Sequence, residues 1–151
     1  MAKARAPKGS DADTDLARDY VAPNGMKFSI SRGKGAEYLA GLRNYMVYRD
    51  LGLAASTNGR VGANTVKAVP GSKERSPWHM HLLDFQLVFV LRGWIKFNYE
   101  NVGEVTLYPG DCINQAPTIR HIEIDHSDDY EGIEITMPAE FRTVGVTPPE
   151  G

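Results

Sequence analysis

Two histidines stand one residue apart in the segment SPWHMHLLDFQLVFVLRGW, which spans residues 76–94. Side chains alternate along a β-strand, so His79 and His81 would point to the same side of a strand formed there. Two imidazoles that converge from one rigid element are what a divalent metal ion requires. A His-x-His pair on its own is often coincidental, and the same two rings can also pack as hydrogen-bonded core residues.

Residues farther along the chain can complete such a site. His121 follows a turn at 116–118 (APT), and it would supply a third imidazole from another strand. Gln86 lies five residues after His81, and with a bend between them its amide oxygen can reach the same point. Asp84 is a competing carboxylate ligand. The preferred ligand set is His79, His81, Gln86 and His121, with open positions left for water or substrate.

Other polar and aromatic side chains could lie at the same site or have a purely structural role. Trp78 either forms a wall of the pocket or packs beneath it, and Tyr99 is a second pocket candidate. Glu123 would share a face with His121, either as a partner for an imidazole N–H or as half of a surface ion pair. His126 lies in the polar segment DHSDDYEG and is predicted to be a solvated loop residue.

The composition narrows the class of protein. The chain has 151 residues and a net charge of −2 without a basic block, which argues against a nucleic-acid partner. It contains no apolar run near the roughly 18 residues that a membrane-spanning helix needs, and no apolar stretch follows its first basic residues. Cys112 is the single cysteine, expected to be a buried small residue rather than a nucleophile. A cytoplasmic protein with a small-molecule substrate is the expectation.

Short strands bounded by Gly, Pro, Asn or Asp indicate an all-β sandwich or barrel. Long amphipathic helices are lacking, which argues against an α/β fold. The expected strands cover 26–30, 45–51, 60–69, 76–91, 94–99, 105–107, 111–115, 120–125 and 132–137, with a helical turn within 35–42. Residues 1–25 are predicted to be a mobile arm, and 26–151 a single domain with its barrel core at about 60–140.

At these residues the chain resembles the cupin superfamily. The first cupin motif is commonly written G-x5-H-x-H-x(3,4)-E-x6-G, and every interval from His79 through Gln86 to Gly93 fits it. The second is G-x5-P-x-G-x2-H-x3-N, and Gly110 and His121 have its spacing. The resemblance implies a jelly-roll β-barrel (a double-stranded β-helix), preceded here by an N-terminal extension. It also implies a homodimer, since small cupins commonly form one.

Four positions depart from the two motifs. Lys73 stands where the first motif begins with glycine, Thr118 replaces a glycine of the second motif after a proline shifted to Pro117, and Asp125 replaces its asparagine. These three concern turns. The fourth departure is in the site itself, because Gln86 replaces the usual glutamate.

The glutamine leaves the predicted ligand set neutral, so a bound dication would keep a charge near +2 and attract anions. It would also polarise a carbonyl strongly and acidify bound water. Glutamine at this position resembles cupins that rearrange unsaturated uronic acids and some polyketide cyclases. The resemblance implies one divalent ion, Zn, Fe, Mn or Ni, and an enzyme acting on a small oxygenated acid or ketone. Lewis-acid isomerase or lyase chemistry and O2-dependent dioxygenation both fit. The alternative is a non-catalytic cupin that binds a sugar or effector.

Overall fold

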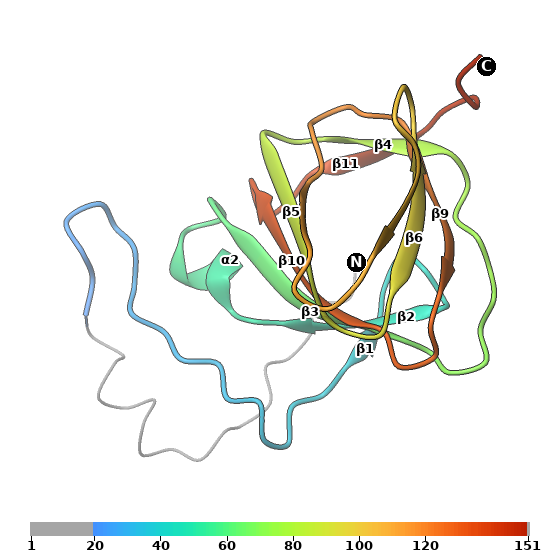
Figure 1. Ribbon diagram of the computed structural model, residues 1–151. Helices are drawn as coiled ribbons and strands as arrows, with labels where there is room; N and C mark the ends of the chain where they lie inside the picture. Colours follow the sequence, from blue (N-terminus) through green and yellow to red (C-terminus); the bar gives the residue numbers. More distant parts are fainter. Residues whose placement is uncertain (1–19, 151) are drawn as a thin grey trace.

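The computed structural model describes residues 20–150, which fold into two antiparallel β-sheets that face each other around a common interior (Figure 1). The first sheet contains, in spatial order, β1 (Leu39–Ala40), β2 (Met46–Asp50), β3 (Gly62–Ala68), β10 (Glu131–Met137), β5 (Phe85–Arg92) and β8 (Cys112–Asn114). The second contains β11 (Arg142–Gly145), β4 (His79–Leu82), β9 (His121–His126), β6 (Ile95–Tyr99) and β7 (Gly103–Leu107). The all-β prediction is confirmed.

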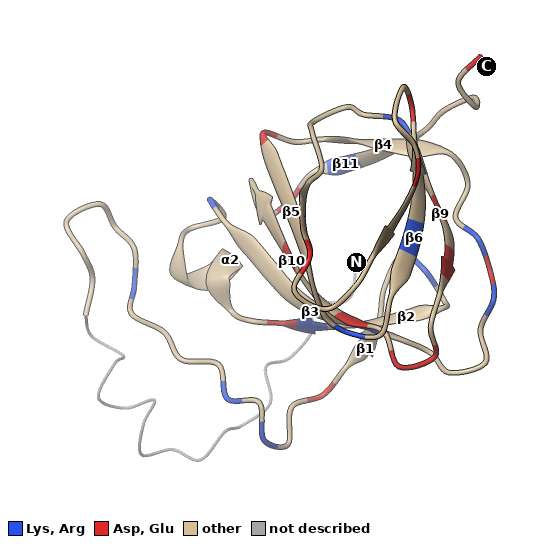
Figure 2. Ribbon diagram, viewed as in Figure 1, with Lys and Arg blue, Asp and Glu red and all other residues tan. Residues whose placement is uncertain are grey.

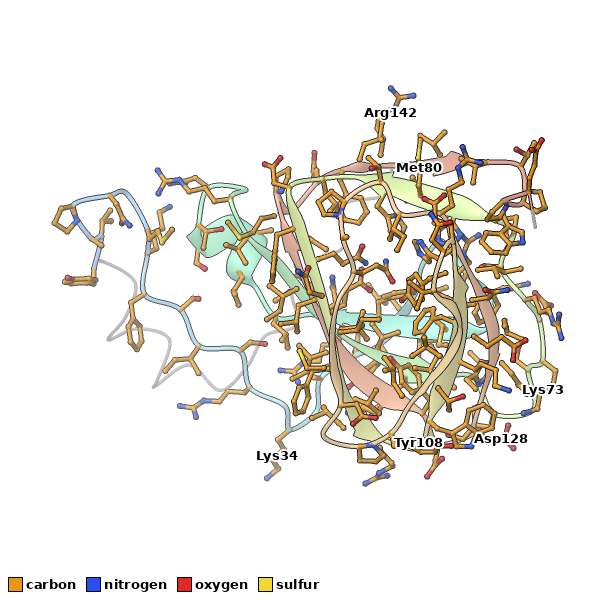
Figure 3. All side chains as sticks on the ribbon, turned by 45° about the horizontal axis from the view of Figure 1, so that its top comes forward. Lys34, Lys73, Met80, Tyr108, Asp128 and Arg142 are labelled. Carbon is orange, nitrogen blue, oxygen red and sulfur yellow. The ribbon has the colours of Figure 1, made fainter. Side chains whose placement is uncertain are left out.

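The interior is built by alternate residues of the central strands. Val88 and Val90 of β5 are buried, as are Ile95, Phe97 and Tyr99 of β6, while their neighbours in sequence are more exposed. This is the alternation expected of strands with one face in the core. Figure 3 shows the side chains of both sheets filling the space between them.

A glycine makes the connection between β5 and β6. Gly93 has φ 65°, in the left-handed region that favours glycine. A Cβ atom there would lie 2.1 Å from Oγ of Ser127 and 2.9 Å from the backbone nitrogen of Tyr130. The glycine that ends the first motif is therefore required both by backbone conformation and by close packing.

The N-terminal part of the described chain differs from the expected one. Residues 26–30 form no strand, and Lys27 makes only an isolated bridge with Val21. No helical turn occurs within 35–42, where β1 instead pairs with β2. Both predictions were wrong: glycines weaken a helix within 35–42, and pairing with β2 gives residues 39–40 an extended conformation instead. Most of the predicted arm, 1–19, lies outside the described residues. Residues 20–38 extend away from the barrel on the side of α2, where the N–H of Lys27 donates to the carbonyl of Ser56 (Figure 1).

Besides β1, two elements were not expected from sequence, the short helix α2 (Leu53–Ser56) and the strand β11. The sheets consequently extend from 39 to 145, beyond the predicted core of 60–140. Cys112 is exposed rather than buried, because β8 is an edge strand that turns Ile113, and not its neighbours, toward the core.

Acidic and basic residues are scattered over both sheets (Figure 2). Within residues 20–150, no helix has the length and apolar character needed to cross a membrane.

Candidate metal centre

Three histidines meet inside the barrel on two adjacent strands. His79 of β4 lies directly opposite His121 of β9, and the ring centroids are 4.2 Å apart. His81, two residues along β4, is on the same face, with its ring centroid 4.9 Å from that of His79 and 5.1 Å from that of His121. One nitrogen from each ring lies within 4.8 Å of the others. The alternation predicted for His79 and His81 is thus present, and the third imidazole comes from the neighbouring strand.

Hydrogen bonds fix which nitrogen of each ring faces the common point. The Nδ1 atoms of His79 and His121 donate to the backbone oxygens of Pro77 and Ile119, at 2.7 and 2.9 Å. Nδ1 of His81 lies 2.9 Å from Oγ1 of Thr143, on β11. Because a carbonyl oxygen can only accept, at least two rings carry their proton on Nδ1 and leave Nε2 unprotonated, with a lone pair. Partners of this kind orient imidazoles that bind metal.

The surroundings keep these imidazoles neutral. Burial lowers the pKa of all three, with smaller contributions from neighbouring positive charge. The pKa of His81 falls to about 3 and that of His121 to about 4. The neutral imidazole is the form that binds a metal ion, so the site needs no deprotonation at neutral pH.

Gln86 is buried on β5 and faces the same interior, but its amide is engaged with other side chains. Its Oε1 accepts a hydrogen bond from Nε2 of Gln115 at 2.9 Å, and its Nε2 donates to Oε1 of Glu134 at 2.9 Å. Nε2 of Gln115 is also 3.2 Å from Nε2 of His121. The OH of Tyr99 donates to Oε1 of Gln115 at 2.6 Å. The NH2 group of Gln115 therefore contacts two predicted ligands, and the single lone pair of His121 Nε2 must give up this contact before it can bind an ion.

These groups line a cavity of about 310 Å³ between the two sheets. Its wall contains the three histidines, Gln86, Gln115 and the charged residues Arg43, Glu123 and Glu134. Apolar side chains such as Met46, Val66 and Phe141 complete it. The predicted pocket residues Trp78 and Tyr99 are not among the lining residues: Trp78 is half-buried beside His79, and Tyr99 lies behind His121 with its ring stacked on the imidazole at 5.4 Å.

Two carboxylates in the wall differ in their partners. Glu123 does share the face of His121, but it accepts a hydrogen bond from the OH of Tyr45 at 2.5 Å rather than from an imidazole. Glu134 accepts from Gln86. Burial and the negative charge of Glu123 raise the pKa of Glu134 to about 7, against the smaller opposing effect of the hydrogen bond. Glu134 can therefore hold or release a proton near neutral pH.

The remaining sequence candidates lie away from the histidines. Asp84, the competing ligand, is exposed in the turn between β4 and β5. His126 is not a solvated loop residue: it ends β9, it is 2 % exposed, and its ring stacks on Tyr45. The prediction was wrong because β9 continues past the expected end, and its last side chain turns into the core. Thr118 keeps the left-handed turn of the motif glycine that it replaces, with φ 64°.

Among the lining residues that were missed from the sequence are Arg43, Gln115 and Glu134. Glu134 had a detectable signal, since it is a charged residue in the middle of an otherwise apolar strand, GIEITM. Gln115 follows β8 directly, in a segment whose direction depends on tertiary packing. Arg43 lies in a turn far from either motif, where no local pattern marks it.

No family model matches the sequence, and no curated protein sequence matches it. Solved structures do match its fold. The polyketide cyclase RemF from Streptomyces resistomycificus is 15 % identical, with a TM-score of 0.65 over 82 % of this chain and 88 % of that one. KdgF from a Halomonas species is 17 % identical, with a TM-score of 0.60 over 74 % of this chain and 96 % of that one.

A sugar phosphate isomerase of the cupin superfamily from Silicibacter pomeroyi is 20 % identical, with a TM-score of 0.56 over 69 % of this chain and 72 % of that one. At these identities the likeness concerns the fold. The two facing antiparallel sheets of this chain are consistent with it. The chain has the cupin fold, with a group of three histidines that can hold a metal ion inside its barrel.

Proposed function

We propose that the protein is a metal-dependent enzyme that acts on a small oxygenated organic acid or ketone by Lewis-acid isomerisation or lyase chemistry. The observation that carries this proposal is the convergence of three neutral imidazoles on one point in the wall of a cavity of about 310 Å³. Three imidazoles on two adjacent strands leave other coordination positions free for a chelating substrate. Such a donor set suits Zn, Fe, Mn or Ni.

The ligand charge supports an anionic or chelating substrate. A divalent ion held by neutral groups polarises a carbonyl and attracts carboxylate or enolate oxygens. The solved structures similar in fold include proteins named as a polyketide cyclase and a sugar phosphate isomerase, which are consistent with non-oxidative chemistry on oxygenated carbon.

The side chains around the imidazoles would supply proton transfer and an apolar surrounding. Gln86 cannot act as a carboxylate base, so proton transfer falls to a neighbouring group. Glu134 is held against Gln86 at 2.9 Å, and its pKa of about 7 suits it to accept and return a proton at neutral pH. Apolar side chains in the same wall would limit the access of water to the reacting atoms.

The metal content of purified protein tests the proposal. We expect about one divalent ion per chain in the wild type, and less than about a tenth of that in His81→Ala, because two remaining imidazoles bind weakly. Inductively coupled plasma mass spectrometry would measure both after reconstitution and desalting. A matched control is His126→Phe, which replaces the fourth, buried histidine with another ring and should leave the metal content unchanged.

Equal metal content in the wild type and His81→Ala, or none in either, would contradict the proposal. With metal bound, the loaded protein is incubated with chelating hydroxy acids, keto acids and diketones, while oxygen and products are followed. Product formation without oxygen uptake supports Lewis-acid chemistry. Oxygen uptake in a fixed ratio to product would instead indicate that the reaction is a dioxygenation. Ligands that bind and are recovered unchanged would favour the binding module instead.

A further inference from the structure

The turn that carries Arg43 is held rigidly over the cavity. The backbone N–H of Met46 donates to the carbonyl of Arg43 at 3.3 Å, which closes the turn between β1 and β2. After the exposed Asn44 come Tyr45 and Met46, and each of these is only 2 % exposed. On the other side, a Cβ atom at Gly41 would lie 2.4 Å from the ring of Tyr48, so the turn rests directly on this ring. The position of Arg43 is therefore set by the core.

Arg43 is part of the cavity wall, and its guanidinium has no partner of opposite charge among the described residues. The residue is half-buried and lines the same cavity as the three histidines. Within residues 20–150, no hydrogen bond or ion pair involves this guanidinium. Two carboxylates face the same space, but Glu123 is bonded to the OH of Tyr45, and Glu134 to the amide of Gln86.

The charge of Arg43 also reaches the histidines. It lowers the pKa of each of the three imidazoles, an effect smaller than that of burial. Arg43 and the imidazoles are thus neighbours across one cavity. A molecule small enough for about 310 Å³ can contact both at once.

A partly desolvated cation without a counter-charge favours an anion, and a guanidinium binds a carboxylate with two parallel hydrogen bonds. We propose that Arg43 binds a carboxylate of the substrate that is separate from the oxygens facing the three imidazoles. This inference rests on the proposed function and narrows its substrate class to acids with a carboxylate remote from the chelating group. It also gives the segment before the motifs a role in specificity.

Two probes of nearly equal length test the assignment. 2-Oxoglutarate and 2-oxopentanoate share the same chelating keto-acid head, and only the first has a remote carboxylate. Isothermal titration of zinc-loaded wild type should give 2-oxoglutarate about tenfold tighter binding, in line with one charge-assisted contact. In Arg43→Gln the two affinities should become equal within about twofold, with that for 2-oxopentanoate unchanged, while Arg43→Lys should retain part of the preference.

Arg142→Gln is the matched control, because this arginine is exposed on β11 and its side chain points away from the barrel (Figure 3). It should keep the full preference. Equal binding of the probes by loaded wild type, or an unchanged preference in Arg43→Gln, would overturn the role of Arg43 while the metal content of both proteins stands. A wild type that takes up none of Zn, Fe, Mn or Ni would overturn the proposed function, and this inference with it.

Discussion

Glu134 introduces an ionisable carboxyl into a cavity whose imidazoles stay neutral. Its pKa is raised to about 7 by burial and by the charge of Glu123. An unfolded chain would release this proton near pH 4.5. Between these values the unfolded state binds fewer protons than the folded state, so this group makes the folded state less stable as pH rises from about 4.5 to 7.

Glu134→Gln should remove this pH dependence from the metal-free protein. We expect equal stability of variant and wild type near pH 4.5, and a gain of at least about 1 kcal/mol for the variant at pH 8, since each pKa unit is worth about 1.4 kcal/mol. Urea denaturation at several pH values would measure the difference, and comparison with wild type cancels the titration of the histidines. Glu104→Gln, an exposed residue of β7, should show no such gain. A constant difference at every pH would contradict the assignment.

The site residues that could be predicted from the sequence are those set by strand alternation or by motif spacing. His79 and His81 follow from the alternation of a strand, and His121 from the spacing of the second motif. Gln86 could be placed at the cavity, but its engagement by Gln115 could not be predicted. That contact joins residues 29 positions apart, whose directions depend on how β8 ends.

At the scale of elements, β11 supports the site although it supplies none of the three imidazoles. It pairs with β4 along four residues, with Thr143 opposite His81, and this places the hydroxyl of Thr143 at Nδ1 of that ring. The strand escaped prediction because it is short and lies at the edge of its sheet, so only its pairing defines it. The strands that were predicted have an alternating pattern of their own, as in β6.

Thr143→Val should weaken metal binding while the strand persists. Valine keeps the shape and the strand preference of threonine but cannot hydrogen-bond to the imidazole. We expect the affinity for zinc to fall about ten- to hundredfold, as for other partners that orient metal-binding imidazoles. Competition with a chromogenic chelator would measure it. Thr106→Val on β7 is the control, and a loss of affinity equal in both variants would count against an orienting role.

At the scale of the whole molecule, the fold could be predicted because two motifs fix the order of the central strands and the turns between them. The N-terminal region could not, since its conformation depends on pairing with β2 and on contacts such as that of Asn58 with the carbonyl of Gly25. The homodimer stays a prediction. Exposed apolar residues such as Phe28 and Leu42 offer surface for one, and light scattering would test it.

The ladder between β4 and β9 is short: it has the single register pair His79 and His121, with one further backbone hydrogen bond on each side, from Ser76 to Glu123 and from Thr118 to His81. By contrast, β6 and β9 pair along five residues. Of the three imidazoles, two are on β4 and one is on β9. An ion bound there would cross-link two strands that share few backbone hydrogen bonds. We expect chelation to speed amide deuterium exchange in β4 and β11 by at least about tenfold, equivalent to about 1.4 kcal/mol, and to leave β6 and β7 unchanged. Uniform acceleration in all four strands would contradict this. Metal binding would then stabilise the barrel next to the cavity. The metal-free protein would open first between β4 and β9, in the wall of the proposed substrate site.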